Sequence, residues 1–591
     1  MKKSRKKESP LDAIPKWLTI LFVAVVPLLV RVSMVQYNMA KYDWYPNETV
    51  FFDSYSIFKS KVIITIGSIA LGWLIFQQLK NKLLSIKDPV VIVTLILTFF
   101  TLLSFITSVD KGMASRGYLG RYEGVWVWLS YFAVFLAVYS HKWNKKELNQ
   151  VILSFVISNT ILSIIGIFQY WGIEIPHHEL LRPFTTAFNM QGITFTADYS
   201  INYKVIVQTL YHYNYVGFLA ALSLPFVFSL VLHEHKMLYK GFYGVLGAAI
   251  LFNLLGSSAR GGLIGVAVSI PFIIALNYKL IFKHKKVAIS AFLILIVIFV
   301  GFETLSNGFV TKRLQSIFTQ VGAPNKLQSI EIEDNKITVF LENRKFDLLV
   351  TDTTGSGWVI EYYLDNEPTE TTGVDEENKV RFEDPFLNHV KNYMVRTEND
   401  FFLALDLYGT PWYFGYQNGE LMFRNPYSNY VSIISPETIG FEGREQLGSA
   451  RGYIWSRALP LILNKPITGY GTDTFALAFP QHDYVGKYNA YNTNNMVVDK
   501  AHNLYIQVAI NSGLIALLAY FSYFIILAKR IFSSIKTNGF NFTSIYQSAF
   551  ITGLIAYFIA SFFNDSTVHV SPVFWMFLAL AFVATKKNRE E

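Results

Sequence analysis

Long apolar segments recur along most of this chain and predict its organisation. About 20 apolar residues are enough for a helix to cross a bilayer. We predict twelve transmembrane helices, at residues 17–36, 62–78, 89–108, 124–140, 150–170, 212–232, 241–257, 262–279, 287–303, 503–528, 544–563 and 571–585. The expected fold class is therefore a polytopic α-helical membrane protein with about 12 transmembrane helices.

Between the ninth and tenth predicted helices the pattern changes to an alternating one. The stretch SIEIEDNKITVFLEN alternates apolar and polar residues on both sides of Asp334-Asn335, as in a β-hairpin. Shorter candidate strands follow, separated by Gly, Asn, Asp and Pro. We expect a β-sandwich or meander over 325–435. Its aromatic residues could stack on sugar rings, but core packing is favoured because strands prefer aromatics anyway; these residues include Trp358, Trp412, Tyr413 and Tyr416.

These patterns predict four parts. They are an N-terminal membrane region of nine helices (1–303), a β-rich insertion (304–448), an amphipathic and active-site segment (449–502), and a C-terminal membrane region of three helices (503–591). Residues 449–464 are predicted to form an amphipathic helix on the membrane surface, which Pro460 should kink or end.

The distribution of Lys and Arg predicts the orientation. Loops on one side carry 24 basic residues, whereas the short loops on the other side carry 9 although they are longer in total. Basic loops stay in the cytoplasm. We therefore expect a multi-pass plasma-membrane protein with both termini cytoplasmic, and with the β-rich insertion and the active site extracytoplasmic.

Composition narrows the possible functions. The chain has no cysteine, which excludes disulfides and thiolate metal sites. The net charge of +9 hides an acidic insertion, because residues 304–449 carry 22 Asp and Glu against 12 Lys and Arg. The chain has no long basic tract of the kind that would indicate binding to nucleic acid. The histidines His177, His178 and His482 lack the spacing of metal ligands, so no metal site is expected.

Four polar motifs fall on the predicted outer side. They are GYLGRYEG with Arg121, YHYNYVG with His212 and Asn214, SSARGG with Arg260, and a long stretch with Arg451, Gly469, Gly471 and His502. An arginine at a helix end is usually an interfacial anchor. Arg260, however, lies in a turn of small residues that a ligand can approach closely, and guanidinium groups bind phosphate bidentately.

His502 has two possible roles. It could be an ordinary interfacial histidine, or it could accept a proton from a hydroxyl nucleophile, since imidazole titrates near neutral pH. His569 is expected to be an ordinary loop residue.

The motifs resemble those of the O-antigen ligase / Wzy-type polymerase superfamily of GT-C-type membrane glycosyltransferases. His502-Asn503, nine residues and Gly513 are similar to the ligase motif H-[NSQ]-x9-G-x-x-[GTY], although Ala516 departs from it. SSARGG resembles a Ser-Arg-Gly segment, and YHYNYVG resembles Asn-Pro-Asn-Tyr-x-Gly with Tyr213 in place of proline. The resemblance spans the predicted helices but does not cover the β-rich insertion.

The resemblance implies a glycan donor linked to polyprenyl diphosphate and a glycan, lipid or protein acceptor, without a metal or another cofactor. Arg260 and Arg451 would hold the diphosphate, and His502 would help to activate the acceptor hydroxyl. Substrate-binding candidates are Arg121, His212, Asn214, Gly469, Gly471 and Asn503. Three alternatives stay open: a repeat-unit polymerase, a transporter or flippase of lipid-linked sugars, and a non-enzymatic sugar receptor.

Overall fold

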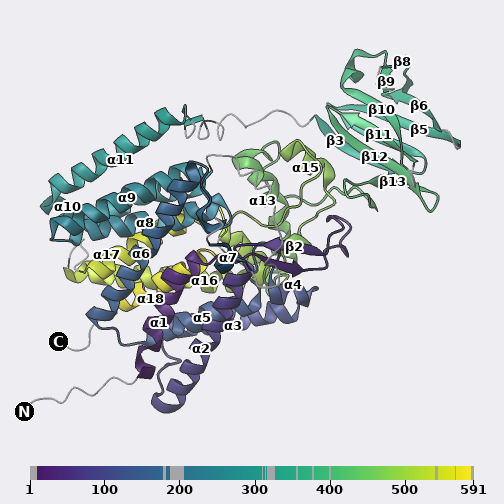
Figure 1. Ribbon diagram of the computed structural model, residues 1–591. Helices are drawn as coiled ribbons and strands as arrows, with labels where there is room; N and C mark the ends of the chain where they lie inside the picture. The colour runs from purple at the N-terminus through teal and green to yellow at the C-terminus, as the bar shows by residue number, and fades with distance from the viewer. Residues whose placement is uncertain are drawn as a thin grey trace, which may run out of the picture.

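The computed structural model describes residues 10–177, 181–186, 205–308, 311–312, 315, 326–354, 357–375, 379–397, 401–538, 544–565 and 567–586. Figure 1 shows a helical bundle, a layer of short helices and a separate β domain.

Helices form at all twelve predicted segments. They are α1 with its adjoining short turns (Pro10–Leu28), α2 (Ile57–Asn81), α3 (Pro89–Ile106), α5 (Val125–Ser140), α6 (Lys145–Tyr170), α8 (Tyr213–His233), α9 (Met237–Ser257), α10 (Arg260–Lys283), α11 (Lys285–Leu305), α16 (Leu504–Asn538), α17 (Ile545–Ala560) and α18 (Ser571–Ala584). Within the described ranges, nine are long and apolar enough to cross a membrane, and α5, α17 and α18 are shorter apolar helices. A membrane protein is therefore supported.

The first helix is shorter than predicted. It ends at Leu28 instead of continuing to residue 36. Leu29 leaves the helical conformation, with φ −65° and ψ +130°, directly after a turn that contains Pro27. Residues Ser33–Gln36 form β1, which pairs with β2 (Val50–Asp53). Arg31 therefore lies outside the helix, with its guanidinium 5.2 Å from the ring centre of Phe58.

Among the described residues, five further α-helices lie outside the twelve predicted segments. They are α4 (Lys111–Arg116), α7 (Arg182–Thr185), α13 (Leu447–Asn464), α14 (Phe475–Ala478) and α15 (Tyr484–Tyr491). The predicted helix at 449–464 is α13, but it continues past Pro460 to Asn464. Its irregular residues are instead at its start, where Gly448, Ser449 and Ala450 have φ values of +65°, +63° and +63°.

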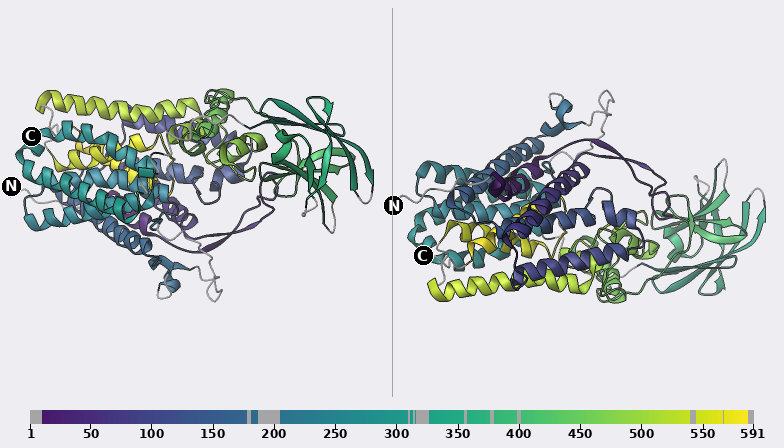
Figure 2. Two further views of the ribbon diagram at one scale, coloured as in Figure 1. Left: turned by 90° about the horizontal axis from the view of Figure 1, so that it is seen from above. Right: turned by 90° about the horizontal axis from the view of Figure 1, so that it is seen from below.

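Polar contacts at one end of the bundle join Tyr139, at the end of α5, to residues of three segments whose basic residues predicted a cytoplasmic location. The hydroxyl of Tyr139 donates to Asp88 at 2.7 Å and accepts from Arg530 at 3.2 Å. Arg530 also donates to the carbonyl of Phe582, and the ammonium of Lys586 lies 4.8 Å from the Tyr139 ring centre. In Figure 2, the long helix α16 runs from the layer of short helices to the end of the bundle farthest from the β domain. Which compartment each end faces stays a prediction.

The insertion forms two antiparallel sheets. The five-stranded sheet contains β3 (Leu327–Glu333), β4 (Lys336–Leu341), β5 (Arg344–Thr354), β6 (Gly357–Leu364) and β7 (Glu367–Pro368), in that order. The seven-stranded sheet has the order β14 (Tyr430–Val431), β13 (Glu420–Arg424), β12 (Thr410–Gln417), β11 (Phe401–Leu407), β10 (Val390–Arg396), β9 (Val380–Phe382) and β8 (Thr371–Val374).

The two sheets share one apolar core, as the prediction of a sandwich requires. Trp412 is fully buried there, and Trp358 and Tyr416 pack against it, so their prediction as packing aromatics is confirmed. The β3–β4 hairpin also forms as predicted, with Glu333 opposite Lys336 and a positive φ of +48° at Asp334. Tyr484 and Tyr488 of α15 join the same core and fasten the β domain to the helical part.

The break inside α16 generates a test of the fold. Gly513 has φ +86° there, and a Cβ at this position would lie 2.2 Å from the carbonyl oxygen of Ile467. We expect Gly513→Ala to reduce the free energy of unfolding by about 2–3 kcal/mol, because alanine is strained at this φ and collides with the backbone. Thermal unfolding of the purified protein in detergent would measure this. Gly72→Ala in α2 is the matched control, since a Cβ added at Gly72 would meet nothing within 4 Å. Equal melting temperatures for the two variants would contradict the expectation.

Candidate active site

A polar cavity of about 320 Å³ opens where four distant chain segments meet. Its lining residues are His212, Tyr213 and Asn214 at the start of α8, Ser258 and Arg260 between α9 and α10, Ser449 and Arg451 at the start of α13, and Asp499, Lys500 and His502 before α16. We call it the cationic cavity, because three lining side chains are basic and one is acidic.

The cationic cavity brings together five residues that the sequence singled out. They are His212, Asn214, Arg260, Arg451 and His502. Their convergence could not be read from the sequence, since nearly 300 residues separate the first from the last. Their roles in binding and catalysis stay predictions.

The two arginines of the cavity donate to neutral oxygens nearby. Arg260 donates to the hydroxyl of Ser449 at 3.1 Å, and Arg451 donates to the carbonyl of Gly448 at 2.6 Å. The Nε of Arg451 and the hydroxyl of Ser258 are buried without a hydrogen-bond partner in the described part of the chain. Burial and the neighbouring Arg260 lower the pKa of Arg451. An anion with several oxygens would satisfy such donors.

His502 is placed to accept a proton. Its Nδ1 lies 3.2 Å from Oδ1 of Asn564, and because this oxygen can only accept, the contact requires the ring proton on Nδ1. The Nε2 lone pair is then available. Burial lowers the pKa of His502, and the charges of Lys500 and Arg451 lower it further, so the ring is neutral at pH 7.

His212 has the opposite proton arrangement. Its Nδ1 accepts a hydrogen bond from the backbone N–H of Asn214 at 3.2 Å, which caps the start of α8. Burial and the charge of Lys500 lower the pKa of His212 to about 3, so the neutral ring carries its proton on Nε2. His212 can therefore donate a hydrogen bond while His502 accepts one.

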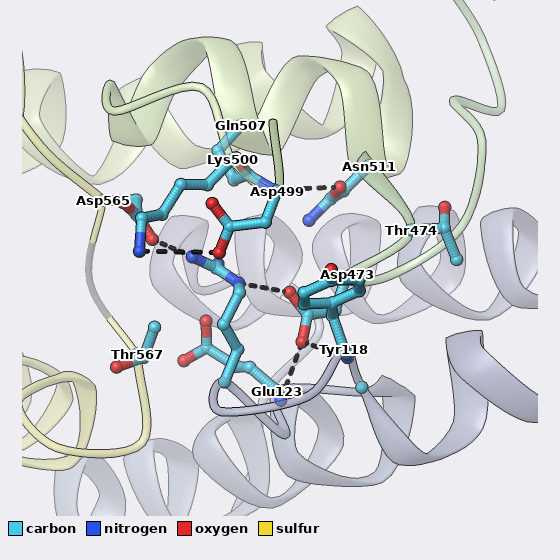
Figure 3. Close-up of polar contacts among 12 residues, drawn as sticks. Tyr118, Glu123, Asp473, Thr474, Asp499, Lys500, Gln507, Asn511, Asp565 and Thr567 are labelled. Atoms are coloured by element: carbon cyan, nitrogen blue, oxygen red, sulfur yellow. Dashed lines mark hydrogen bonds and ion pairs between the residues drawn. The ribbon is translucent and has the colours of Figure 1, made fainter. Parts of the chain in front are cut away.

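Arg121 lies outside the lining of the cationic cavity. Its Nε donates to Asp473 at 2.6 Å, and its Nη1 pairs with Asp565. The other oxygen of Asp473 accepts from the backbone N–H groups of Tyr118 and Glu123, at 2.8 and 3.1 Å (Figure 3). The guanidinium is committed to buried carboxylates, so this geometry favours a positioning role.

Asp565 links this ion pair to the cationic cavity. Burial would raise the pKa of Asp565, but the charges of Arg121 and Lys500 lower it to about 2. The same carboxylate and Asp499 raise the pKa of Lys500 above its ordinary value, although burial opposes this. Lys500, Asp499 and Asp565 gather on one side of the close-up in Figure 3. Lys500 is therefore held charged beside His502.

Three other predicted substrate-binding residues hold the backbone instead of lining the cavity. Gly469 has φ +64° and packs against the backbone of Asn511, while Gly471 has φ +121° and packs against Ser108. Asn503 accepts from the backbone N–H groups of Tyr505 and Ile506 and so caps α16. These residues fix the segment that carries His502.

Sequence reasoning missed several residues. Lys500 could have been found, because it lies two positions before His502 in DKAHN, and Asp565 is an isolated acid in an apolar C-terminal region. His569 lies in the loop before α18 as predicted, but its burial and its contacts were not predicted. It is fully buried, contacts the hydroxyls of Ser56 and Thr567 at 3.2 and 2.8 Å, and stacks on Tyr215.

Two of the histidines considered for a metal lie in the described residues. His482 contacts Asp43 at 3.0 Å, and His178 lies outside the described residues. No group of three or more His, Cys, Asp or Glu residues that could hold a metal ion occurs in the portion of the chain that the structure describes.

Comparison with known proteins finds one family match, which covers part of the chain. A family model described as O-antigen ligase matches residues 408–521, from the last strands of the β domain to the middle of α16. This range contains Arg451, Lys500, His502 and Gly513. The predicted resemblance to the O-antigen ligase / Wzy superfamily is thereby confirmed. No curated protein and no solved structure matches the chain.

The ion pairs of Arg121 generate a stability prediction. Arg121→Ala would leave Asp473 and Asp565 buried without this cation, so we expect the free energy of unfolding to fall by about 3–5 kcal/mol. Thermal unfolding in detergent would measure this. Arg116→Ala is the control, because Arg116 is more exposed, at the end of α4. An unchanged melting temperature in Arg121→Ala would show that the ion pairs contribute little.

Proposed function

We propose that this chain is an O-antigen ligase-like glycosyltransferase. It transfers a glycan from a polyprenyl-diphosphate-linked donor to an acceptor hydroxyl on the outer face of the plasma membrane. The observation that carries the proposal is the cationic cavity, in which Arg260, Arg451 and Lys500 surround a neutral His502. The family match over 408–521 supports the same reaction class.

The cations suit the leaving group. As the bond between the sugar C1 and the diphosphate oxygen breaks, its electron pair stays on that oxygen, and negative charge develops on the diphosphate. Arg260 and Arg451 can bind phosphate oxygens bidentately, and Lys500 adds a point charge. Donors fixed in place before the reaction stabilise such charge more effectively than reorienting water.

His502 suits the acceptor. The acceptor oxygen forms the new bond to C1, and its proton passes to Nε2 of His502. The resulting imidazolium would be stabilised by Asn564 at Nδ1 and by the bound diphosphate. His212, as a donor through Nε2–H, can orient a phosphate or hydroxyl oxygen in the same cavity.

Transport of lipid-linked sugars is a weaker candidate. Transporters place their polar sites near the middle of the membrane, usually on interrupted helices. The cationic cavity lies instead at the helix ends, between the starts of α8, α10, α13 and α16. That location favours chemistry at the membrane surface.

Reconstitution with a lipid-linked oligosaccharide tests the proposal. The wild-type chain should consume the donor, and His502→Ala should reduce the rate at least about 100-fold, since general-base catalysis contributes 10²–10⁴. His502→Asn is a second variant, because asparagine tolerates the φ of +49° at this position. His482→Ala, outside the cavity, is the control. Full activity in both His502 variants would refute the role as base.

Product lengths separate the two forms of the reaction. One block joined to a foreign acceptor identifies a ligase, whereas a ladder of lengths identifies a repeat-unit polymerase. If neither product forms and lipid-linked sugar instead moves across the vesicle membrane, the result would favour the transporter.

The charges around His502 predict a pH effect. Lys500 lowers the pKa of His502, so Lys500→Gln should raise it. A base is active only when unprotonated, so the acid limb of log(kcat/KM) against pH should move to higher pH, apart from any uniform loss of rate. Lys111→Gln, on the short helix α4, is the control. An acid limb that stays in place, or moves to lower pH, would contradict the assignment.

A further inference from the structure

A second cavity, of about 440 Å³, adjoins the cationic cavity. We call it the aromatic cavity, because side chains of tyrosine and phenylalanine make up most of its wall. Its volume falls within the usual range of about 300–1,000 Å³ for small-ligand sites. The N-terminal β1–β2 region, the loop before α5, the segment before α8 and the β domain all contribute to it.

The two cavities share one wall. Asp499 lines both of them. Tyr211 lines the aromatic cavity while the next residue, His212, lines the cationic cavity, and Asp499 is likewise followed by Lys500. If a molecule places its diphosphate in the cationic cavity, the groups next to that diphosphate therefore lie beside the aromatic cavity.

The chemistry of the aromatic cavity differs from that of its neighbour. Asp53 and Asp499 are its charged lining residues, and the described residues that line it include no Lys or Arg. Such a wall offers a phosphate no cationic partner among these residues. It suits an uncharged sugar, whose C–H faces pack on aromatic rings and whose hydroxyls donate to carboxylates and tyrosine oxygens.

Backbone strain supports a role in binding. Tyr122 and Tyr211 have φ values of +49° and +70°, a region that bulky residues seldom occupy. Such strained residues persist where the surrounding structure enforces them, often at ligand sites. Gly120 makes room for one of them, because a Cβ there would lie 2.9 Å from the Tyr211 hydroxyl.

Two aromatic side chains are placed to contact a ligand. Phe52 is 60% exposed although it belongs to the cavity wall. Tyr427 comes from the β domain, in the turn after β13. That turn is fixed to the N-terminal region, because the side-chain amides of Asn425 and Asn429 both donate to the carbonyl of Asp43, at 2.7 and 2.8 Å.

We propose that the aromatic cavity binds an uncharged sugar ring of a glycan substrate. The ring stacks on Phe52 and Tyr427 and hydrogen-bonds to Asp499, beside the diphosphate held in the cationic cavity. The use of this site in transfer rests on the proposed function, but its capacity to bind sugar does not. It also gives the β domain a defined part in substrate binding through Tyr427.

Saturation-transfer NMR on the full-length chain in detergent tests binding without any reaction. The probes are neutral disaccharides of glucose, galactose and N-acetylglucosamine. At least one should bind, and both Phe52→Ala and Tyr427→Ala should weaken it about ten-fold, as expected for loss of one ring contact. Tyr427→Phe keeps the ring and should retain most of the affinity. Tyr363→Ala, on β6 of the other sheet, is the matched control. Absence of binding by every probe, or affinity unchanged in both alanine variants, would overturn the proposal.

A parallel titration with inorganic pyrophosphate separates this proposal from the proposed function. Pyrophosphate should lose affinity in Arg260→Gln and Arg451→Gln but not in Phe52→Ala or Tyr427→Ala. Saccharide binding without pyrophosphate binding would refute the diphosphate site and leave the sugar site standing, and the reverse result would do the opposite.

Steady-state kinetics then identify the source of the sugar. In Tyr427→Ala, a raised KM for the acceptor alone assigns the cavity to the acceptor, whereas a raised KM for the donor alone assigns it to the donor glycan. Unchanged values for both substrates would overturn the proposed use of the site in transfer.

Discussion

The position of the candidate site depends on the buried guanidinium of Arg121 between Asp473 and Asp565. These residues come from the loop before α5, the segment after α13 and the loop before α18, which are far apart in the sequence. A buried carboxylate without a cation is unfavourable, so the three segments are held in one arrangement. Asp565 extends this constraint to Lys500, and through Lys500 to the charge around His502.

This arrangement separates two kinds of chemistry across one wall. Lys500 is kept charged by the carboxylates beside it, while His502 and His212 are kept neutral by burial and by the neighbouring cations. On the other side of Asp499 the wall is aromatic and acidic. A substrate that is anionic at one end and neutral at the other matches both sides. A substrate with only one of these properties would leave one cavity unused.

Much of the fold was evident from the sequence because membrane helices need long apolar runs and strands need alternation. A helix forms at each of the twelve predicted segments, although the first is shorter than predicted, and the hairpin at Asp334-Asn335 forms as predicted. Apolar character alone did not reveal that the first helix stops after Pro27, because residues 29–36 are apolar enough to continue it. Pro460 was expected to kink or end its helix, but α13 continues past it to Asn464.

Part of the candidate site could also be predicted, because polar residues are conspicuous beside long apolar segments. Arg260, Arg451 and His502 stood out as polar residues beside apolar helices, and the structure brings them together. The partners of Arg121 could not be predicted, because an ion pair between residues more than 300 positions apart leaves no local pattern. Gly469, Gly471 and Asn503 were recognisable as unusual, but only the folded chain shows that they support the backbone.

The attachment of the β domain has an evolutionary consequence. Its sheets pack on their own core, and its contribution to the wall of the aromatic cavity is Tyr427, from a turn outside the strands. The groups around His502 come entirely from other segments. If the aromatic cavity selects the sugar, descendants of this chain can acquire a new glycan preference by altering one turn, while the residues that would perform the chemistry stay unchanged.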